Sequence, residues 1–131
     1  MPRTLKCTPA TRSGRRAKAE QFNEAAATVR TLADEDSDVA DAYVTLLVHG
    51  IAASDVICCA RLGEHAMGEN HAEAVQLLAT AVDKKLAGAL ETLLGVKTKA
   101  GYSERPVSST DLVKAERATE RLIQAMRELA T

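Results

Sequence analysis

The chain has 131 residues and a formal net charge of −1, with 46% apolar and 27% charged residues. This composition indicates one globular domain and excludes an intrinsically disordered chain. With no Trp, one Phe and two Tyr, the core must be built from aliphatic side chains. Small side chains let helix axes approach closely.

The longest apolar region, residues 42–60, is interrupted by polar side chains and predicts no membrane span. No apolar stretch of signal-peptide length follows Met1, so we expect a cytoplasmic protein with no membrane partner. The cysteines are Cys7, Cys58 and Cys59, an odd number whose adjacent pair could bond only through a strained ring. We therefore expect no disulfide framework.

Charge is distributed unevenly. The first 18 residues carry six basic side chains and no acidic one, which leaves −7 for the remainder. A basic arm suits an anionic partner, although termini are commonly solvated and disordered for other reasons. We expect residues 1–13 to form a flexible basic arm and residues 14–131 to form a single domain.

Apolar residues recur at helical spacing along the rest of the chain, and no strand-like alternation is present. The second predicted helix is apolar on nearly all sides and stops at Gly63, while Asn70 and Glu73 form a capping-box pattern that starts the third. We expect an all-α fold, a four-helix up-down bundle. Its predicted helices span about residues 14–32, 39–62, 71–100 and 108–129.

Asp55 and His49 are polar residues within the apolar second helix. A buried carboxylate needs a partner, so Asp55 either pairs with a basic side chain from another helix or a dimer partner, or opens onto a ligand pocket. His49 lies six residues earlier, roughly 120° away around a continuous helix, so the two form no obvious dyad. We expect both side chains to be buried, and His49 to be a core or interface residue.

Basic residues gather at two helix ends. His71 lies near the start of the third helix, where free amides attract anions, and Arg61 could hold a phosphate bidentately. Lys97, Lys99 and Tyr102 lie near the end of that helix. Helix capping and the helix dipole explain such residues equally well. The functional alternative is a phosphate-binding site that uses these five residues.

Common enzyme signatures are absent, including Gly-rich phosphate loops and nucleophile elbows. Three His without suitably spaced carboxylates or paired Cys make a poor metal-ligand set, so we expect no metal and no cofactor. The aromatic residues are too few and too scattered to suggest a stacking platform for single strands. Any nucleic-acid contact should be mainly to the backbone.

The order of segments resembles the HEPN family, the higher eukaryotes and prokaryotes nucleotide-binding domains, over residues 39–129. The resemblance rests on a small-residue-rich central helix and on a His that opens the next one. It also rests on a basic residue, a small residue and Tyr at that helix's end. The matching segments read YVTLLVHGIAASDVICCARLG, NHAEAVQLL, LLGVKTKAGY and DLVKAERATERLIQAMREL. The resemblance implies a four-helix, commonly dimeric domain.

Many HEPN proteins are ribonucleases with an Arg, four to six residues, then His. Here three residues separate Arg61 from His65, and nine separate Arg61 from His71. The usual nuclease pair is therefore not carried over. The resemblance implies instead a nucleotide- or RNA-associated binding or regulatory domain, paired with a small nucleotidyltransferase in a toxin–antitoxin or defence module.

Two alternatives remain. One is a diverged metal-independent ribonuclease that uses Arg61 and His71. The other is a plain helical homodimeric interaction module in which Asp55 and His49 serve packing or dimer register.

Overall fold

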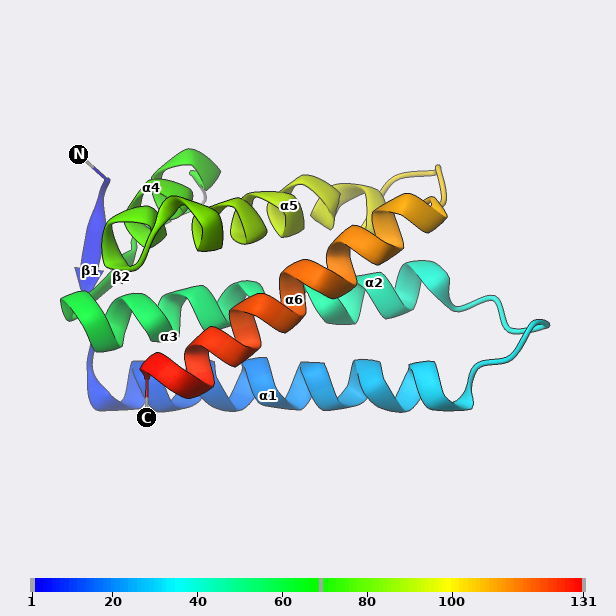
Figure 1. Cartoon of the computed structure of the whole chain (residues 1–131), viewed down its shortest axis with the longest axis horizontal. Helices are drawn as coiled ribbons and strands as arrows, with labels where there is room; N and C mark the ends of the chain where they lie inside the picture. Colours follow the sequence, from blue (N-terminus) through cyan, green and yellow to red (C-terminus); the bar gives the residue numbers. More distant parts are fainter. Residues whose placement is uncertain (1, 69, 131) are drawn as a thin grey trace.

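The structure, a computed structural model, describes residues 2–68 and 70–130. Its fold is all-α apart from one small sheet (Figure 1). Helix α1 forms one layer, α2 and α3 a second, and α4 and α5 a third, while α6 crosses them diagonally (Figure 1). The elements are β1 (Thr4–Lys6), α1 (Pro9–Leu32), α2 (Ala40–Val48), α3 (Ile51–Leu62), β2 (Glu64–Ala66), α4 (His71–Ala81), α5 (Lys84–Gly101) and α6 (Ser109–Leu129).

The first helix begins at Pro9, five residues before its predicted start. The Thr8 side chain accepts a hydrogen bond from the Thr11 amide, and Pro at the first helical position has no amide to satisfy. Arg12 and Arg16 both donate to the Ala130 carbonyl, at 2.7 and 3.0 Å. The predicted boundary at residue 13 therefore falls inside α1, and these basic side chains cap the end of α6.

The predicted second helix is interrupted once, at His49 and Gly50. At the interruption the Leu47 carbonyl accepts from the Gly50 amide at 2.9 Å and from the Thr119 hydroxyl of α6 at 3.0 Å. A Cβ on Gly50 would lie 3.2 Å from Thr119 Cγ2. This contact is tighter than usual, so a larger residue at position 50 would require Thr119 of α6 to shift slightly.

The predicted third helix is two helices, α4 and α5, which is a correction to the expected four helices. The chain breaks at Val82, and the Asp83 carboxylate then caps α5 by accepting from the Leu86 amide at 2.8 Å. Apolar residues keep their helical spacing through the break, so the sequence pattern did not predict it. An Asp three residues before a buried Leu was the available signal.

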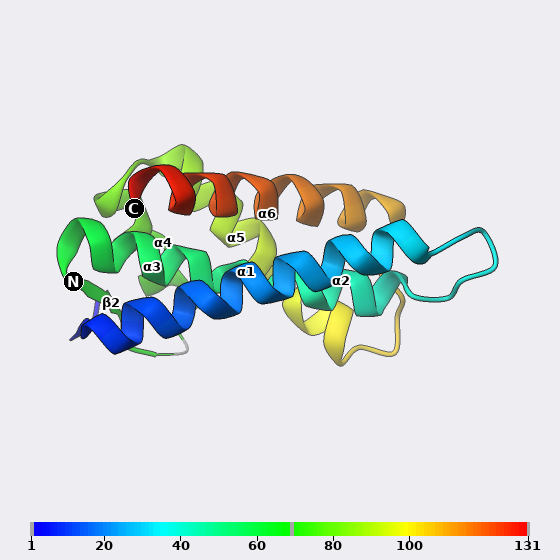
Figure 2. The same ribbon diagram turned by 90° about the horizontal axis from the view of Figure 1, so that it is seen from below.

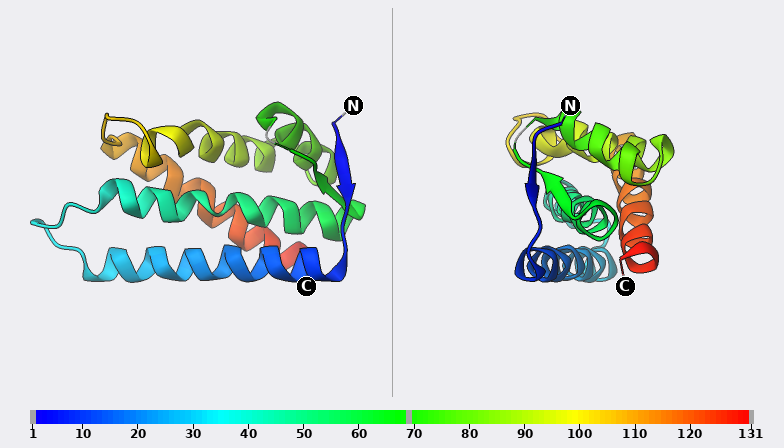
Figure 3. Two further views of the ribbon diagram at one scale, coloured as in Figure 1. Left: turned by 180° about the vertical axis from the view of Figure 1, so that it is seen from behind. Right: turned by 90° about the vertical axis from the view of Figure 1, so that its left-hand side faces the viewer.

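The expectation of no strand is wrong. β1 pairs antiparallel with β2, with Thr4 opposite Ala66, Leu5 opposite His65 and Lys6 opposite Glu64. Two further backbone hydrogen bonds extend this pairing at its two ends. Figure 3 shows β1 running along one end of the molecule, from the level of α4 to that of α3, and the chain then continues to α1. Strands of three residues are too short to produce a readable alternation.

The expectation of no disulfide is also wrong, because Cys7 and Cys59 form one across 52 residues, with their Cα atoms 5.6 Å apart. The adjacent Cys58 is a buried free thiol. Sequence spacing excluded a bond between the adjacent pair but did not exclude either one bonding to Cys7. The antiparallel pairing of β1 with β2 brings Cys7 beside the end of α3.

The core is aliphatic, as composition predicted, and its largest fully buried side chains include Ile57, Leu78, Leu90, Leu93 and Leu122. The segment Ala40–Leu62 is long and apolar enough to cross a membrane, but 61% of its most apolar window is buried inside the protein. Core helices pass the same test. Figure 2 shows the connection between α1 and α2 projecting at the end of the molecule remote from the sheet.

Candidate functional site

Two adjoining hollows form a continuous groove along α3. The larger has a volume of about 620 Å³ and the smaller about 380 Å³, and both are lined by Arg15, Ile51, Asp55 and Lys97. We call the larger hollow the histidine end and the smaller the aromatic end. The described residues that line them come from α1, α2, α3, α5, β1 and the β2–α4 region, whereas none comes from α6. Figure 3, seen from behind, shows α1, α3 and α5 with α6 on their far side.

Asp55 of α3 and Arg15 of α1 form an ion pair at the middle of the groove. Arg15 Nη1 donates to Asp55 Oδ2 at 2.8 Å, and the Asp55 side chain is 18% exposed. Burial raises the pKa of the Asp55 carboxyl above its ordinary value, against the opposing charges of Arg15 and His65. Asp55 thus pairs with a basic side chain from another helix and also faces a cavity.

The histidine end is lined by His65 of β2 and His71, the first residue of α4. His65 is only 5% exposed, and its Nδ1 lies 2.9 Å from the Ala66 carbonyl. A carbonyl can only accept, so Nδ1 carries the proton and Nε2 is available to a second partner. His71 is exposed, beside the Asn70 side chain that caps α4.

The aromatic end contains His49 and Tyr102. The His49 ring stacks on Phe22 of α1, with ring centroids 3.8 Å apart and planes 8° from parallel. Its Nδ1 lies 3.0 Å from the Thr45 carbonyl, which fixes the ring's orientation. Tyr102 follows α5 and is 86% exposed. Of the three Phe and Tyr residues, Tyr102 alone lines the aromatic end, Phe22 reaches it only through the His49 ring, and Tyr43 lines another pocket.

Of the predicted site residues, the structure brings His71, Lys97 and Tyr102 to the groove, together with Asp55 and His49. The prediction that His49 is buried is wrong, because the residue is exposed. The prediction for Asp55 holds in part, since its side chain is mostly but not fully buried. The break at Gly50 separates His49 from Asp55, so the angle counted around one continuous helix does not apply.

Two predicted phosphate ligands lie elsewhere. Arg61 is exposed in the last turn of α3 and is not among the described residues that line the groove. Lys99 donates to Asp111 Oδ2 at 2.6 Å and so stabilises the start of α6. Lys97 and Lys99 are two residues apart, which turns them about 200° from each other around α5.

Sequence reasoning missed Arg15 and His65 as groove residues. Arg15 was assigned to the basic stretch near the N-terminus, although Asp55 predicted a basic partner on another helix. His65 was counted in a connecting loop, and no local pattern predicts that its backbone pairs with Leu5. Both residues reach the groove only because the chain start packs along α3 and β2.

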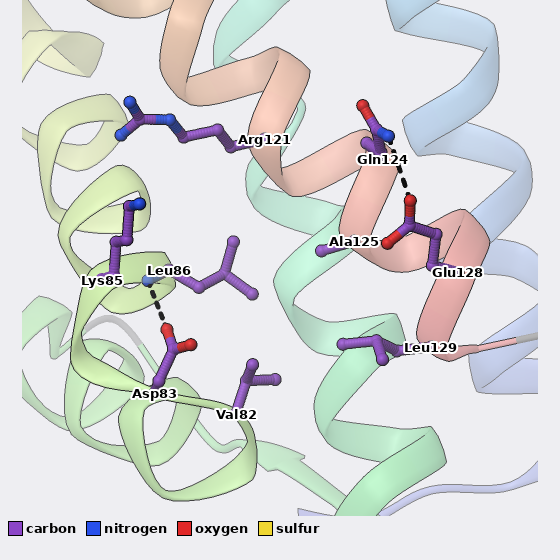
Figure 4. Close-up of a pocket in the computed structure, with 9 residues that line it drawn as sticks. All are labelled: Val82, Asp83, Lys85, Leu86, Arg121, Gln124, Ala125, Glu128 and Leu129. Atoms are coloured by element: carbon purple, nitrogen blue, oxygen red, sulfur yellow. Dashed lines mark hydrogen bonds between the residues drawn. The ribbon is translucent and has the colours of Figure 1, made fainter.

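A separate pocket of about 380 Å³ lies between the α4–α5 junction and α6 (Figure 4). Val82, Leu86 and Leu129 point into it, while Lys85 and Arg121 lie at its rim (Figure 4). Three of its polar side chains are used locally: Asp83 caps α5, and Gln124 donates to Glu128 one turn later.

Among residues 2–68 and 70–130, no three His, Cys, Asp or Glu side chains gather as a metal-ligand set. The groove's fixed charges are Arg15 and Lys97 against Asp55, a balance of +1 with its histidines neutral. It can therefore accept an anion, and protonation of a histidine would add to its attraction.

No protein-family model, no curated protein and no solved structure matches this chain. The chemistry assigned to the groove rests on its own geometry.

Proposed function

We propose that the groove binds a nucleotide, or a nucleotide at the end of an RNA, and that the chain is a HEPN-like binding or regulatory domain. The observation that carries the proposal is the convergence of His65, His71 and Lys97 on a cavity that continues into an aromatic end. These side chains come from three different elements, and helix capping does not explain their meeting.

The histidine end suits the phosphate. Lys97 supplies a fixed positive charge, His71 lies at the start of an 11-residue helix, and the Nε2 atom of His65 is available to a ligand. Charge-assisted hydrogen bonds and free helix N-terminal amides are the groups that bind phosphates in proteins. The net positive charge of the groove would attract a phosphate here.

The aromatic end suits the base. His49 is held on one face by Phe22, and the exposed Tyr102 lies across the same hollow. Base stacking on such rings contributes about 1–3 kcal/mol per base and tolerates any base identity. Asp55, between the two ends, can accept hydrogen bonds from ribose hydroxyls, as acidic residues do in other nucleotide sites.

The proposal extends to the fold and the partners. If α2 with α3 and α4 with α5 each count as one interrupted helix, then α1, these two and α6 correspond to the four-helix up-down bundle of HEPN domains. We propose a cytoplasmic homodimer whose partner is a small nucleotidyltransferase in a toxin–antitoxin or defence module. Co-purification with a transferase encoded beside this chain would test the partner directly.

One observation favours the alternative of a metal-independent ribonuclease: His65 and His71 line the same cavity as Lys97. One imidazole can take the proton of a ribose 2′-hydroxyl as it attacks phosphorus, while the other protonates the departing 5′-oxygen. Lys97 would stabilise the charge that develops on the phosphate. The residue paired with His71 would then be His65, in place of the predicted Arg61.

Calorimetric titration with AMP, ATP and short RNAs tests binding. We expect saturable binding that is lost in the His71→Ala/Lys97→Ala double variant and kept in Lys85→Ala/Arg121→Ala, whose residues line the other pocket. Absence of binding by folded wild-type protein to every probe would contradict the proposal.

Incubation with an RNA pool in EDTA tests the alternative of a ribonuclease. Cleavage by wild type that disappears in both His65→Ala and His71→Ala would establish it.

A further inference from the structure

The Cys7–Cys59 disulfide fastens the start of the chain to the end of α3. Cys7 lies between β1 and Thr8, the cap of α1, and Cys59 lies in the last turns of α3. The Cys7 amide also donates to the Gly63 carbonyl at 2.9 Å. The covalent bond and this hydrogen bond hold β1 against the segment that leads from α3 into β2.

β1 in turn forms one wall of the histidine end. Leu5 lines that hollow and lies opposite His65 in the sheet register. Arg3 pairs with Glu73 in the first turn of α4, two residues after His71. β1 and the residue before it therefore contact both elements that carry the histidines of the histidine end.

Without the disulfide, β1 is weakly held. It has three residues, both Leu5 and Lys6 are exposed, and the ion pair of Arg3 is exposed to solvent. Two-stranded pairs of this length are at most marginally stable in water, and chain ends with few buried contacts open most easily. Apart from the backbone that leads into α1, the disulfide is the one covalent link between this strand and the helices in the described chain.

A reductant can reach the disulfide. Cys7 and Cys59 line a surface pocket of about 440 Å³ together with Arg12 and Arg16. Cys7 is partly exposed, whereas Cys59 is 7% exposed, so attack at Cys7 Sγ is the open route. The two guanidinium groups favour an approaching thiolate and the thiolate that leaves.

The third cysteine does not compete. Cys58 is buried, and its burial, with the nearby Asp55 charge, raises the pKa of its thiol to about 12. Only a thiolate attacks a disulfide, so Cys58 is a poor internal nucleophile toward its neighbour Cys59. Exchange therefore depends on a thiol from outside.

We propose that Cys7–Cys59 is a reversible redox-modification site, which a dithiol reductant opens, and that its opening releases β1 and weakens ligand binding at the histidine end. The second part rests on the proposed nucleotide-binding function. If the chain resides in the cytoplasm, the site fits the general rule that cytosolic disulfides are usually transient and redox-sensing.

The step balances as ordinary thiol–disulfide exchange. A thiolate of the dithiol attacks Cys7 Sγ, the bond to Cys59 Sγ breaks, and the electron pair leaves on Cys59. The second thiol of the reductant then attacks the mixed disulfide and releases Cys7. The protein gains two electrons and two protons, and the reductant becomes a cyclic disulfide.

The test compares oxidised protein, protein reduced with dithiothreitol, and the Cys7→Ser variant. Calorimetry measures AMP binding, and hydrogen exchange measures amide protection over residues 4–7 and 64–67. Coupling between sites typically changes affinity by about 5- to 150-fold, and we expect the lower end, about fivefold weaker binding, in both the reduced and the Cys7→Ser protein. Faster exchange in the two segments should accompany it. Cys58→Ser is the matched control and should keep the redox response.

Equal affinity and equal exchange in the oxidised and reduced forms would overturn the proposal, as would three free thiols in protein purified without reductant. If neither form binds any nucleotide while both are folded, the proposed function fails. The redox site is then decided by exchange alone, where unchanged protection of residues 4–7 on reduction overturns it and faster exchange supports it.

Discussion

The groove along α3 and the pocket between α5 and α6 differ in how their polar groups are used. At the pocket, Asp83 caps its own helix and Gln124 donates to Glu128 within one helix, so these three polar side chains serve local structure (Figure 4). At the groove, Arg15 and Asp55 meet across two helices, and His65 and His71 come from a strand and another helix. The interactions at the pocket stay within single helices, whereas those at the groove join different elements.

Volume does not distinguish the two, because the pocket and the aromatic end both measure about 380 Å³. What distinguishes them is the number of elements that contribute polar side chains and the environment that those side chains share. The raised pKa of Asp55 is one sign, since burial at the groove centre costs its charged form more than Arg15 and His65 recover.

Removal of the Cys7–Cys59 disulfide, which holds β1 at the groove, should give the largest loss of stability among these predictions. Closing a loop of 52 residues removes chain entropy from the unfolded state that is worth about 4 kcal/mol of stability. We expect urea unfolding of the Cys7→Ser/Cys59→Ser variant to show a loss of that size. Cys58→Ser keeps the loop closed and controls for loss of a thiol. A loss below about 1 kcal/mol would mean that the denatured chain is hardly constrained by the bond.

Lys97 and Lys99 provide a matched pair on one helix. Loss of a charged hydrogen bond to a ligand costs about 1.5–3 kcal/mol, so Lys97→Ala should weaken AMP binding about 10- to 100-fold. Lys99→Ala should leave that affinity unchanged, because Lys99 faces Asp111 instead. Equal losses in both variants would indicate a general electrostatic effect and would remove the distinction between the groove and the rest of the surface.

The Asp55→Asn variant tests how much the buried charge at the groove centre lowers the free energy of unfolding. The raised pKa means that folded protein binds this proton more tightly than unfolded protein does. Stability conferred by Asp55 therefore falls as pH rises from the ordinary carboxyl pKa of 3.8 through the folded value. We expect wild type to lose stability relative to Asp55→Asn over that rise, measured by urea unfolding at several pH values. An unchanged difference across pH would show that Arg15 fully compensates for the burial.

Asp111 lies outside both hollows. Its contribution to stability should be the smallest of these effects, and its pH dependence should be opposite in sign to that of Asp55. Hydrogen bonds from Lys99 and Ser108 lower the pKa of its carboxyl to about 2. Its contribution is thus present above the ordinary pKa of 3.8 and is lost as pH falls toward 2. Lys99→Ala should cost about 0.5–1 kcal/mol at neutral pH and less at pH 2, where about half of the Asp111 carboxyl is protonated. A loss independent of pH would assign it to helix packing instead.

Helix existence was predictable because apolar spacing is a local signal. The stop at Gly63 and the caps at Asn70 and Ser108 are encoded within a few residues, and the structure has them, with a full capping box only at Ser108. The break at Val82 was not predictable from spacing, because apolar residues continue through it on both sides. The interruption at Gly50 depends on contact with Thr119, which is 69 residues away along the chain.

The candidate site was predictable only in part. His71, Lys97, Tyr102, Asp55 and His49 stood out because each is polar or aromatic where its local pattern is helical. Arg61 stood out for the same reason, yet it lies outside the groove. Its position in a predicted helix does not show which side of that helix faces the other elements.

By itself, the sequence determined the all-α character, the aliphatic core and most helix ends, since these follow from periodicity and capping chemistry within a few residues. Tertiary structure alone decided the groove, the Arg15–Asp55 pair and the Cys7–Cys59 bond. Each of these joins residues at least 40 positions apart. Which residues meet depends on how the helices and the short sheet pack, and the local sequence around each residue does not indicate its partner.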